Sequence, residues 1–180
     1  MGQRRTEVLR AAIELLDEVG LDGLTMRLLA SRLGVRASAL YRHYPSKQAL
    51  LDAMVAHLVV PPDGALPPLE GPWDELLRAV AIGAREVMLA HRDGARLMTT
   101  FQQPSGDAVT VFQGLVAALI AAGLPQDGAT VAVDTVMAYV NGSTIEEQAR
   151  KADTWPREQL DRAFRAGLEL IITGIRGSLP

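Results

Sequence analysis

The sequence predicts an all-α fold with an N-terminal three-helix helix-turn-helix domain and a larger C-terminal helical domain. Three observations predict it: apolar residues repeat at helical spacing along most of the chain, aromatic residues make up only 4% of it, and one proline- and glycine-rich segment divides it. The 180 residues, 48% of them hydrophobic, are enough to bury a sizeable core. Because the chain has no cysteine, disulfides and thiolate metal sites are excluded.

The N-terminal part begins with two helices separated by a short turn. Apolar residues at i, i+4, i+7 and i+8 predict a helix over residues 4–19, and Gly20 ends it where a left-handed cap is usual. Thr25 is a good N-cap for a second helix, because its hydroxyl can accept a hydrogen bond from a backbone N–H of the first turn. Gly34 ends this second helix.

Two more helices and a boundary complete this part. A third, short helix fits residues 36–43 and ends before Pro45, and Ser46 opens a fourth. Residues 59–72 are dense in proline and glycine and predict a domain boundary. The chain therefore divides into a helix-turn-helix domain (1–46), a connecting helix (47–60), a linker (61–72) and a ligand-binding and dimerisation domain (73–180).

The C-terminal part keeps helical periodicity, with further helices over residues 73–91, 95–102, 107–122, 127–149 and 156–176. The last two are apolar over a wide arc, so each must be covered on more than one side. We expect a partner subunit to cover them, with a fully internal helix as the alternative. Gly167 and Gly174, spaced by seven, would let two helices cross closely. Residues 108–126 carry no charge, but polar residues and glycines interrupt them, so we expect a buried helix and no membrane span.

The net charge of −3 is divided unevenly along the chain. Residues 1–60 carry +2 and the remainder −5, and residues 21–48 contain five basic residues against Asp22 alone. A locally basic segment on an acidic protein is the asymmetry expected of a nucleic-acid-binding domain. On charge alone, a solvated surface is an equally good interpretation.

The order of the helices gives this basic segment a more specific meaning. Two short helices joined by a glycine-containing turn form a helix-turn-helix, whose second helix lies in the major groove of DNA. The free amides at the start of the first short helix suit a phosphate. We expect Arg27, and secondarily Arg42, to contact bases. Phosphate contacts are expected from Thr25, Tyr41, His43 and Lys47. The expected DNA-contacting residues are Thr25, Arg27, Arg36, Ser38, Tyr41, Arg42, His43 and Lys47.

Residues 11–54 also carry an ordered set of motifs. EVG ends the first helix, LT precedes the second, LGV precedes the third, ALYRHY lies in the third and SKQALL opens the fourth. In this order the motifs resemble the DNA-binding domain of the TetR repressor family. The resemblance implies a transcriptional regulator, most simply a repressor, that binds a palindromic operator on double-stranded DNA as a homodimer. Activation stays open, because the same domain can recruit as well as block.

Three segments of the C-terminal part, WDELLRAVA, LAHRDGARL and GLELIITGI, resemble the tetracycline-repressor subgroup of that family. The resemblance implies an all-helical body in which two helices of each subunit form a four-helix dimer interface. Those helices would be residues 127–149 and 156–176. The connection between them, about residues 151–155, is shorter than in the tetracycline repressors.

The same resemblance implies a small-molecule site whose residues depart from those of the tetracycline-sensing members. Met98 stands where a histidine holds their magnesium–drug chelate, Phe101 replaces a threonine and Val80 an asparagine, whereas their glutamate from the partner subunit is retained as Glu146. Because a thioether is a poor ligand for Mg²⁺, we expect no metal, no cofactor and a bulky, largely apolar effector. The candidate lining residues are Met54, His57, Val80, Ala84, Met88, Met98, Phe101, Phe112, Val116, Met137 and Asn141.

Two other classes of function fit the sequence less well. His91-Arg92-Asp93 is similar to a kinase HRD motif, but Met98 stands where its asparagine is expected, and no glycine-rich loop or HExxH motif accompanies it, so we expect no enzyme. The alternative is a helical dimerisation or ligand-binding protein without specific DNA binding. Measuring salt-dependent DNA binding would distinguish it from a transcriptional regulator. Because no apolar segment follows the N-terminus, we expect no signal peptide and a cytoplasmic protein.

Overall fold

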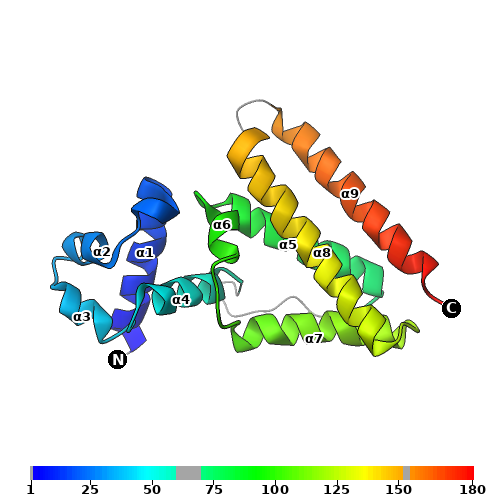
Figure 1. Cartoon of the computed structure of the whole chain (residues 1–180), viewed down its shortest axis with the longest axis horizontal. Helices are drawn as coiled ribbons and strands as arrows, with labels where there is room; N and C mark the ends of the chain where they lie inside the picture. The colour runs from blue at the N-terminus through cyan, green and yellow to red at the C-terminus, as the bar shows by residue number, and fades with distance from the viewer. Residues whose placement is uncertain (1, 60–69, 152–154) are drawn as a thin grey trace.

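The computed structural model describes residues 2–59, 70–151 and 155–180, and within these ranges its regular structure is entirely helical, as predicted. Helices α1–α3 gather at one end of the molecule, and α5–α9 form the rest, with α4 leading from one to the other (Figure 1). We call residues 2–46 the head and residues 70–180 the body. The elements are α1 (Gly2–Gly23), α2 (Met26–Arg32), α3 (Ala37–Tyr41), α4 (Lys47–Val59), α5 (Trp73–Leu89), α6 (Gly94–Met98), α7 (Gly106–Ala121), α8 (Gln126–Glu146), the π-helix η1 (Glu147–Lys151) and α9 (Arg157–Gly177).

The head packs around an apolar core to which all of its helices contribute. Leu16 of α1, Leu24 before α2 and Leu29 of α2 are fully buried, and Leu40 anchors α3 with 1% of its surface exposed. Tyr44 donates from its hydroxyl to the carbonyl oxygen of Arg5 at 3.2 Å, which ties the end of the helix-turn-helix to the start of α1. Each of these apolar residues lies at a position that the helical periodicity predicts to face inward.

Helix α1 extends further than the sequence predicts. The first helical segment ends at Gly20 as predicted, where φ is 74° and ψ is 174°, and a short second helical turn to Gly23, included in α1, was not predicted. A left-handed φ of this kind is accessible to glycine without strain, so the position of the break is set by the sequence. The chain resumes the helix because the backbone N–H of Leu21 donates to the carboxylate of Asp93 at 2.9 Å, in the body.

Helix α4 connects the head to the body. Ser46 caps it, accepting a hydrogen bond from the backbone N–H of Ala49 at 3.0 Å. The linker predicted over residues 61–72 lies outside the described residues except for 70–72, where Pro72 is the N-cap of α5. The other body helices begin and end within a few residues of their predicted bounds, and η1 extends α8 as a π-helix, which periodicity did not predict.

The body packs around α5 and α8, with α7 and α9 laid against them. Its core is mainly aliphatic, and its members without exposed surface are Leu77, Ala81, Ala95, Leu119, Ala129, Val133, Val136, Val140 and Ile172. Residues 108–126, without charge, fall mainly on α7, which buries Leu115 and Leu119 on one face. No helix within the described ranges is long and apolar enough to cross a membrane.

Helix α6 joins the two cores. Its residue Leu97 belongs to the apolar cluster of the head, whereas Ala95 belongs to that of the body, and Met98 packs against both. Polar contacts reinforce the junction: the carboxylate of Asp17 accepts from the backbone N–H of Arg92 at 2.9 Å, and Arg96 pairs with Asp22 at 2.9 Å. The hydrogen bond from Arg96 lowers the pKa of Asp22 below its ordinary value.

Helices α8 and α9 run alongside each other and cross closely at Gly167 (Figure 1). A Cβ atom at Gly167 would overlap the hydroxyl of Tyr139, which donates to the carbonyl oxygen of Phe164 at 3.0 Å. The close crossing expected at Gly167 is therefore present within one chain. Gly174 has nothing within 4 Å of its Cβ position, and Leu170 is 76% exposed, so the outer face of α9 is open.

Candidate functional site

The sequence-predicted contacts of α2 lie at its exposed N-terminal turn. Thr25 is the N-cap, and its hydroxyl oxygen accepts from the backbone N–H of Leu28 at 3.1 Å. Arg27, the second residue of the helix, is exposed. The capping bond fixes the first turn, so the remaining free amides and the Arg27 guanidinium project from one rigid end of the helix.

Helix α3 is short and is held by a single buried side chain, Leu40. Its other predicted contacts lie outward: Ser38 and Arg42 are exposed, and Tyr41 is 48% exposed although it carries a large ring. Arg36 is the N-cap without a side-chain hydrogen bond, so its guanidinium is not used to stabilise the helix. The exposed side chains of Ser38, Tyr41 and Arg42 therefore contribute little to the stability of the fold, as expected of residues that bind a partner.

The cations of the head, together with Lys47 at the start of α4, fall into two groups. Arg10 and Arg32 pair with Glu14 and Glu18 on the outer side of α1. In contrast, within the part of the chain that the structure describes, no carboxylate lies within ion-pairing distance of a second set of cations. This unpaired set is Arg4, Arg5, Arg27, Arg36, Arg42 and Lys47. Four of its six members were predicted to contact DNA.

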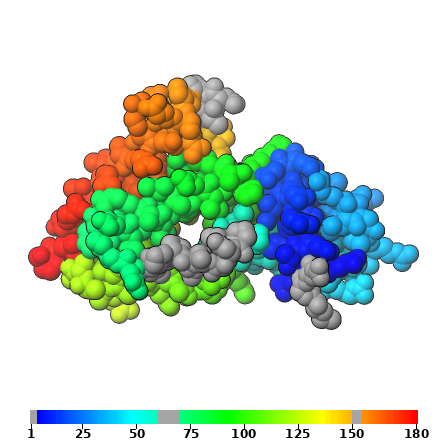
Figure 2. Space-filling view, turned by 180° about the vertical axis from the view of Figure 1, so that it is seen from behind, coloured from blue at the N-terminus to red at the C-terminus, as the bar shows by residue number. Residues whose placement is uncertain are grey.

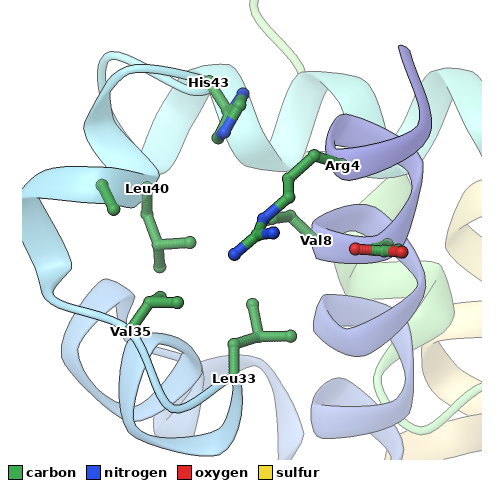
Figure 3. A pocket seen from close by; sticks show the side chains of 8 residues that line it. Arg4, Val8, Leu33, Val35, Leu40 and His43 are labelled. Carbon is green, nitrogen blue, oxygen red and sulfur yellow. The ribbon is translucent and has the colours of Figure 1, made fainter. Parts of the chain in front are cut away.

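Arg4 is a residue of this set that sequence reasoning missed. It lies at the rim of a pocket of about 200 Å³ between α1 and the helix-turn-helix, with apolar walls that include Val8, Val35 and Leu40. Figure 3 shows the Arg4 side chain reaching from α1 into this pocket, on the side where His43 lies. Arg4 is thereby placed beside an expected phosphate contact. Two adjacent arginines before the first acidic residue were the signal for it in the sequence.

The expected effector-lining residues are spread over α4–α8 and differ in burial. Met54 and Met88 are fully buried, in the cores of the head and the body respectively, and Phe101 is 43% exposed. The others are half-buried on the walls between the helices: His57, Val80, Ala84, Met98, Phe112, Val116, Met137 and Asn141. In the space-filling view an opening passes through the body beside α5 (Figure 2).

Two of the half-buried candidates are polar and have no hydrogen-bond partner in the described residues. His57 lies on α4 and Asn141 on α8, and neither side chain has a hydrogen bond to another described group. No group of three or more histidine, aspartate or glutamate residues able to hold a metal ion occurs among the described residues. The arrangement offers an organic ligand apolar walls and a few polar groups, which is the usual make-up of a small-molecule site.

A buried ion-pair network in the body was also missed by sequence reasoning. Arg85 of α5 makes a bidentate pair with Glu147 of η1, with distances of 2.8–3.1 Å, and reaches Asp161 of α9 at 2.8 Å. Its guanidinium also stacks over the ring of Phe164 at 4.8 Å. Burial raises the pKa of Asp161, but the hydrogen bonds from Arg85 and Arg157 outweigh it, so the net pKa is lowered. The network fixes three helices together.

A helix-turn-helix that carries unpaired cations and is joined to an all-helical body is the architecture of a DNA-binding regulator. Two protein-family models match the chain: bacterial regulatory proteins of the tetR family over residues 8–54, and the tetracyclin repressor-like C-terminal domain over residues 66–160. The chain belongs to the TetR family. As a member of this family, it is a ligand-responsive transcriptional repressor. The family is one of non-enzymatic regulators, so the expectation that the protein is not an enzyme is confirmed.

Individual relatives are similar over nearly the whole chain. The class C tetracycline repressor protein of Escherichia coli is 34% identical over 198 residues, covering 96% of this chain and 90% of the relative. A variant TetR of Acinetobacter baumannii AYE in complex with minocycline has a TM-score of 0.81 at 34% identity, covering 97% of each chain. BioQ with its natural double-stranded DNA operator has a TM-score of 0.76 at 31% identity, covering 95% of this chain and 96% of that one.

Proposed function

We propose that the protein represses transcription as a homodimer bound to a palindromic operator, and that a largely apolar small molecule inside the body releases it. The observation that carries this proposal is the unpaired set of cations on the head. Positive side chains without an intramolecular carboxylate are available to DNA phosphates, and each such contact releases counterions from the DNA. That the similar BioQ was solved on an operator supports the same use of this head.

The roles of the DNA contacts follow from their places on the head. Helix α3 enters the major groove, and Arg27, in the first turn of α2, reaches a base edge, where a guanidinium matches the two acceptors of guanine. Lys47 opens α4 and binds a phosphate as a compact point charge. Arg4, beside His43 at the pocket rim, adds a phosphate contact that orients α1 on the duplex.

The dimer forms through the open outer faces of α8 and α9. Val131 on α8 is 63% exposed and Leu170 on α9 is 76% exposed, although both are large apolar residues. Small or apolar exposed residues recur every three or four positions along both helices, a spacing that allows helices to pack closely. They are Val131, Thr135, Ala138 and Gly142 on α8, and Ala163, Ala166, Leu170, Thr173, Gly174 and Gly177 on α9.

The effector binds among the half-buried residues of α4–α8. Met98, Phe112 and Met137 supply flexible or flat apolar surface, which suits a bulky ligand. His57 and Asn141, without partners in the described structure, supply its hydrogen bonds. We propose an effector that binds without a magnesium chelate, in contrast to the tetracycline-sensing members, because the ligand histidine is replaced by Met98. The minocycline complex of the similar TetR supports the position of the site, not its chemistry.

Coupling to DNA runs through α4 and the segment of residues 91–102. Gln48 of α4 donates to the carbonyl oxygen of Thr100 at 2.7 Å, and Asp52 accepts from the backbone N–H of Gln102 at 3.0 Å. Met98 and Phe101, two expected effector contacts, lie in the same segment. An effector that shifts this segment therefore moves α4 and the head, by no more free energy than its differential affinity for the two states.

Titration of fluorescently labelled upstream DNA and scrambled DNA with the full chain, at two salt concentrations, tests the proposal. We expect roughly a thousandfold preference for the upstream operator, with affinity falling as salt rises. Equal and weak binding to every upstream fragment would instead favour a helical ligand-binding protein without specific DNA binding. A compound that binds the body tightly but leaves operator affinity unchanged would contradict the coupling.

A further inference from the structure

The end of α8 and the start of α9 lie at the same end of the body (Figure 1). A second cleft opens there, beside η1. It has a volume of about 620 Å³, and we call it the turn cleft. None of the expected effector-lining residues borders it. Its walls come from the α5–α6 turn, from η1 and from the start of α9, and the lining residues are Leu89, Ala90, His91, Arg92, Asp93, Glu147, Gln148, Trp155, Arg157 and Leu160.

The acceptor groups that border the turn cleft are already used within the protein. Both carboxylate oxygens of Glu147 accept from the buried guanidinium of Arg85, at 2.8–3.1 Å. The carboxylate of Asp93 accepts from the backbone N–H of Leu21 at 2.9 Å. The Gln148 amide is also fully engaged, because it accepts from Ala95 N–H and donates to two backbone carbonyls.

The donors that border the turn cleft are only partly used. Arg92 donates from one terminal nitrogen to the carbonyl oxygen of Glu18 at 2.7 Å, and Arg157 donates from Nε to the carboxylate of Asp161 at 2.9 Å. A guanidinium carries five N–H groups, so both side chains keep free donors, and both are exposed. These two guanidinium groups therefore offer cationic donors to a ligand in the turn cleft. Leu89, the buried Leu160 and the Trp155 ring give it an apolar part.

We propose that the turn cleft is a second ligand site, which binds an organic carboxylate through Arg92 and Arg157 with its hydrocarbon part against Trp155 and Leu160. Arg–carboxylate hydrogen bonds are charge-assisted and directional, so this pair selects a carboxylate over a neutral amide. The floor of the turn cleft is a π-helix, an irregularity found frequently at functional sites.

The position of the turn cleft gives the bound carboxylate a route to the DNA-binding head. Arg92 is also the residue whose backbone N–H and side chain hold Asp17 and Glu18 of α1. His91 adds a contact from Nδ1 to the Asp17 carboxylate at 3.0 Å. The Arg92 guanidinium thus contacts α1 through one nitrogen and also borders the turn cleft, and we infer that a ligand bound to its free N–H groups shifts this contact and changes operator affinity.

The fluorescence of Trp155 tests the site with the full chain. The Trp73→Phe variant leaves Trp155 as the one indole of the sequence, and phenylacetate is the probe, with phenylacetamide as its uncharged counterpart. We expect saturable binding of phenylacetate with Kd in about the millimolar range, as befits so small a ligand, and at least tenfold weaker binding of phenylacetamide. Arg92→Gln and Arg157→Gln should each weaken phenylacetate binding about tenfold.

Arg165→Gln is the matched control, because Arg165 lies exposed on the same helix as Arg157 but outside the turn cleft, and it should leave binding unchanged. Equal affinities for phenylacetate and phenylacetamide, absence of saturation, or an Arg165→Gln effect as large as that of Arg157→Gln would overturn the site. Calorimetric titration of the unsubstituted chain gives the same answer if Trp73→Phe does not fold. Unchanged operator affinity at saturating phenylacetate would overturn the link to the head.

Discussion

The carboxylate of Asp93 accepts a hydrogen bond from the backbone N–H of Leu21 at 2.9 Å, immediately after the break in α1 at Gly20. A residue of the body thus completes a helix of the head. Asp93 has φ 55°, the one positive φ of a non-glycine residue in the described part of the chain. Two left-handed backbone positions, Gly20 and Asp93, therefore meet where head and body join.

Asp93→Ala tests the strength of this junction. The change removes the acceptor of the buried Leu21 N–H and places alanine at a left-handed φ, so we expect the free energy of unfolding to fall by about 1–3 kcal/mol in urea denaturation. Asp93→Asn keeps an acceptor oxygen and a residue that tolerates this backbone, and should lose less. Identical urea midpoints for Asp93→Ala and the unsubstituted chain would show that the bond contributes nothing.

Gly20→Ala and Gly34→Ala form a matched pair for the break in α1. Both glycines have a positive φ, 74° and 64°, so both variants should lose about 1–2 kcal/mol of stability from the backbone. A Cβ at Gly20 would in addition lie 2.7 Å from the Asp93 carboxylate, whereas none of the described atoms lies within 4 Å of one at Gly34. Gly20→Ala should therefore unfold at lower urea concentration, and equal midpoints would mean that Asp93 moves aside freely.

The head could be predicted closely because its signals are local. The Thr25 cap, the stop at Gly34 and the Ser46 cap each act within four residues, and all three predictions are confirmed. The wide apolar arc predicted for the last two helices is present: α9 buries Phe164 and Leu168 within the chain and leaves Leu170 exposed. Where a helix is held in place by burial of one apolar face, the spacing of its apolar residues is enough to predict it from the sequence.

The contacts between distant segments could not be predicted in this way. The Arg85–Glu147 pair joins residues 62 positions apart, and the Asp93–Leu21 bond joins residues 72 positions apart. From the sequence alone, Arg85 and Glu147 would be taken for ordinary surface charges. Periodicity indicates which face of a helix is apolar, but it does not indicate which charged residues pair with each other in the interior. The turn cleft depends on these pairings, so it could be found only in three dimensions.

Gly167→Ala and Gly174→Ala separate packing within the chain from packing between subunits. A methyl group at Gly167 overlaps the Tyr139 hydroxyl, whose ring also stacks on Phe164 with centroids 5.5 Å apart, so we expect a loss of about 1–3 kcal/mol in the free energy of unfolding. Gly174→Ala meets no described atom of its own chain and should stabilise folding by up to about 1 kcal/mol, because alanine favours a helix over glycine, yet weaken the proposed dimer. Sedimentation gives the dimer Kd. An unchanged Kd would place Gly174 outside the interface.

The contact between α5 and α9 predicts a loss of stability in acid. The hydrogen bonds from Arg78 lower the pKa of Asp74 and of Glu169 below the ordinary 3.8 and 4.5. A lowered carboxylate pKa stabilises the fold fully above the ordinary value, and the contribution is lost as the pH falls through the native pKa. Below about pH 4.5, Arg78→Gln should therefore lose less stability per pH unit than the unsubstituted chain or an Arg165→Gln control. Parallel acid profiles of all three in urea titrations would refute the role of Arg78.

Arg27 and Lys47 are expected to differ in what they read on DNA. Arg27→Ala should cost about 1–3 kcal/mol on the operator and relax preference at one base position, because it removes a base contact. Lys47→Ala should weaken binding to operator and scrambled DNA alike, because it removes a phosphate contact. The slope of log affinity against log salt concentration should become less steep by about one. Arg165→Ala, distant from the head, is the control and should do neither. Anisotropy titrations with single-base operator variants measure all three, and a uniform loss across sequences for Arg27→Ala would assign it to phosphate instead.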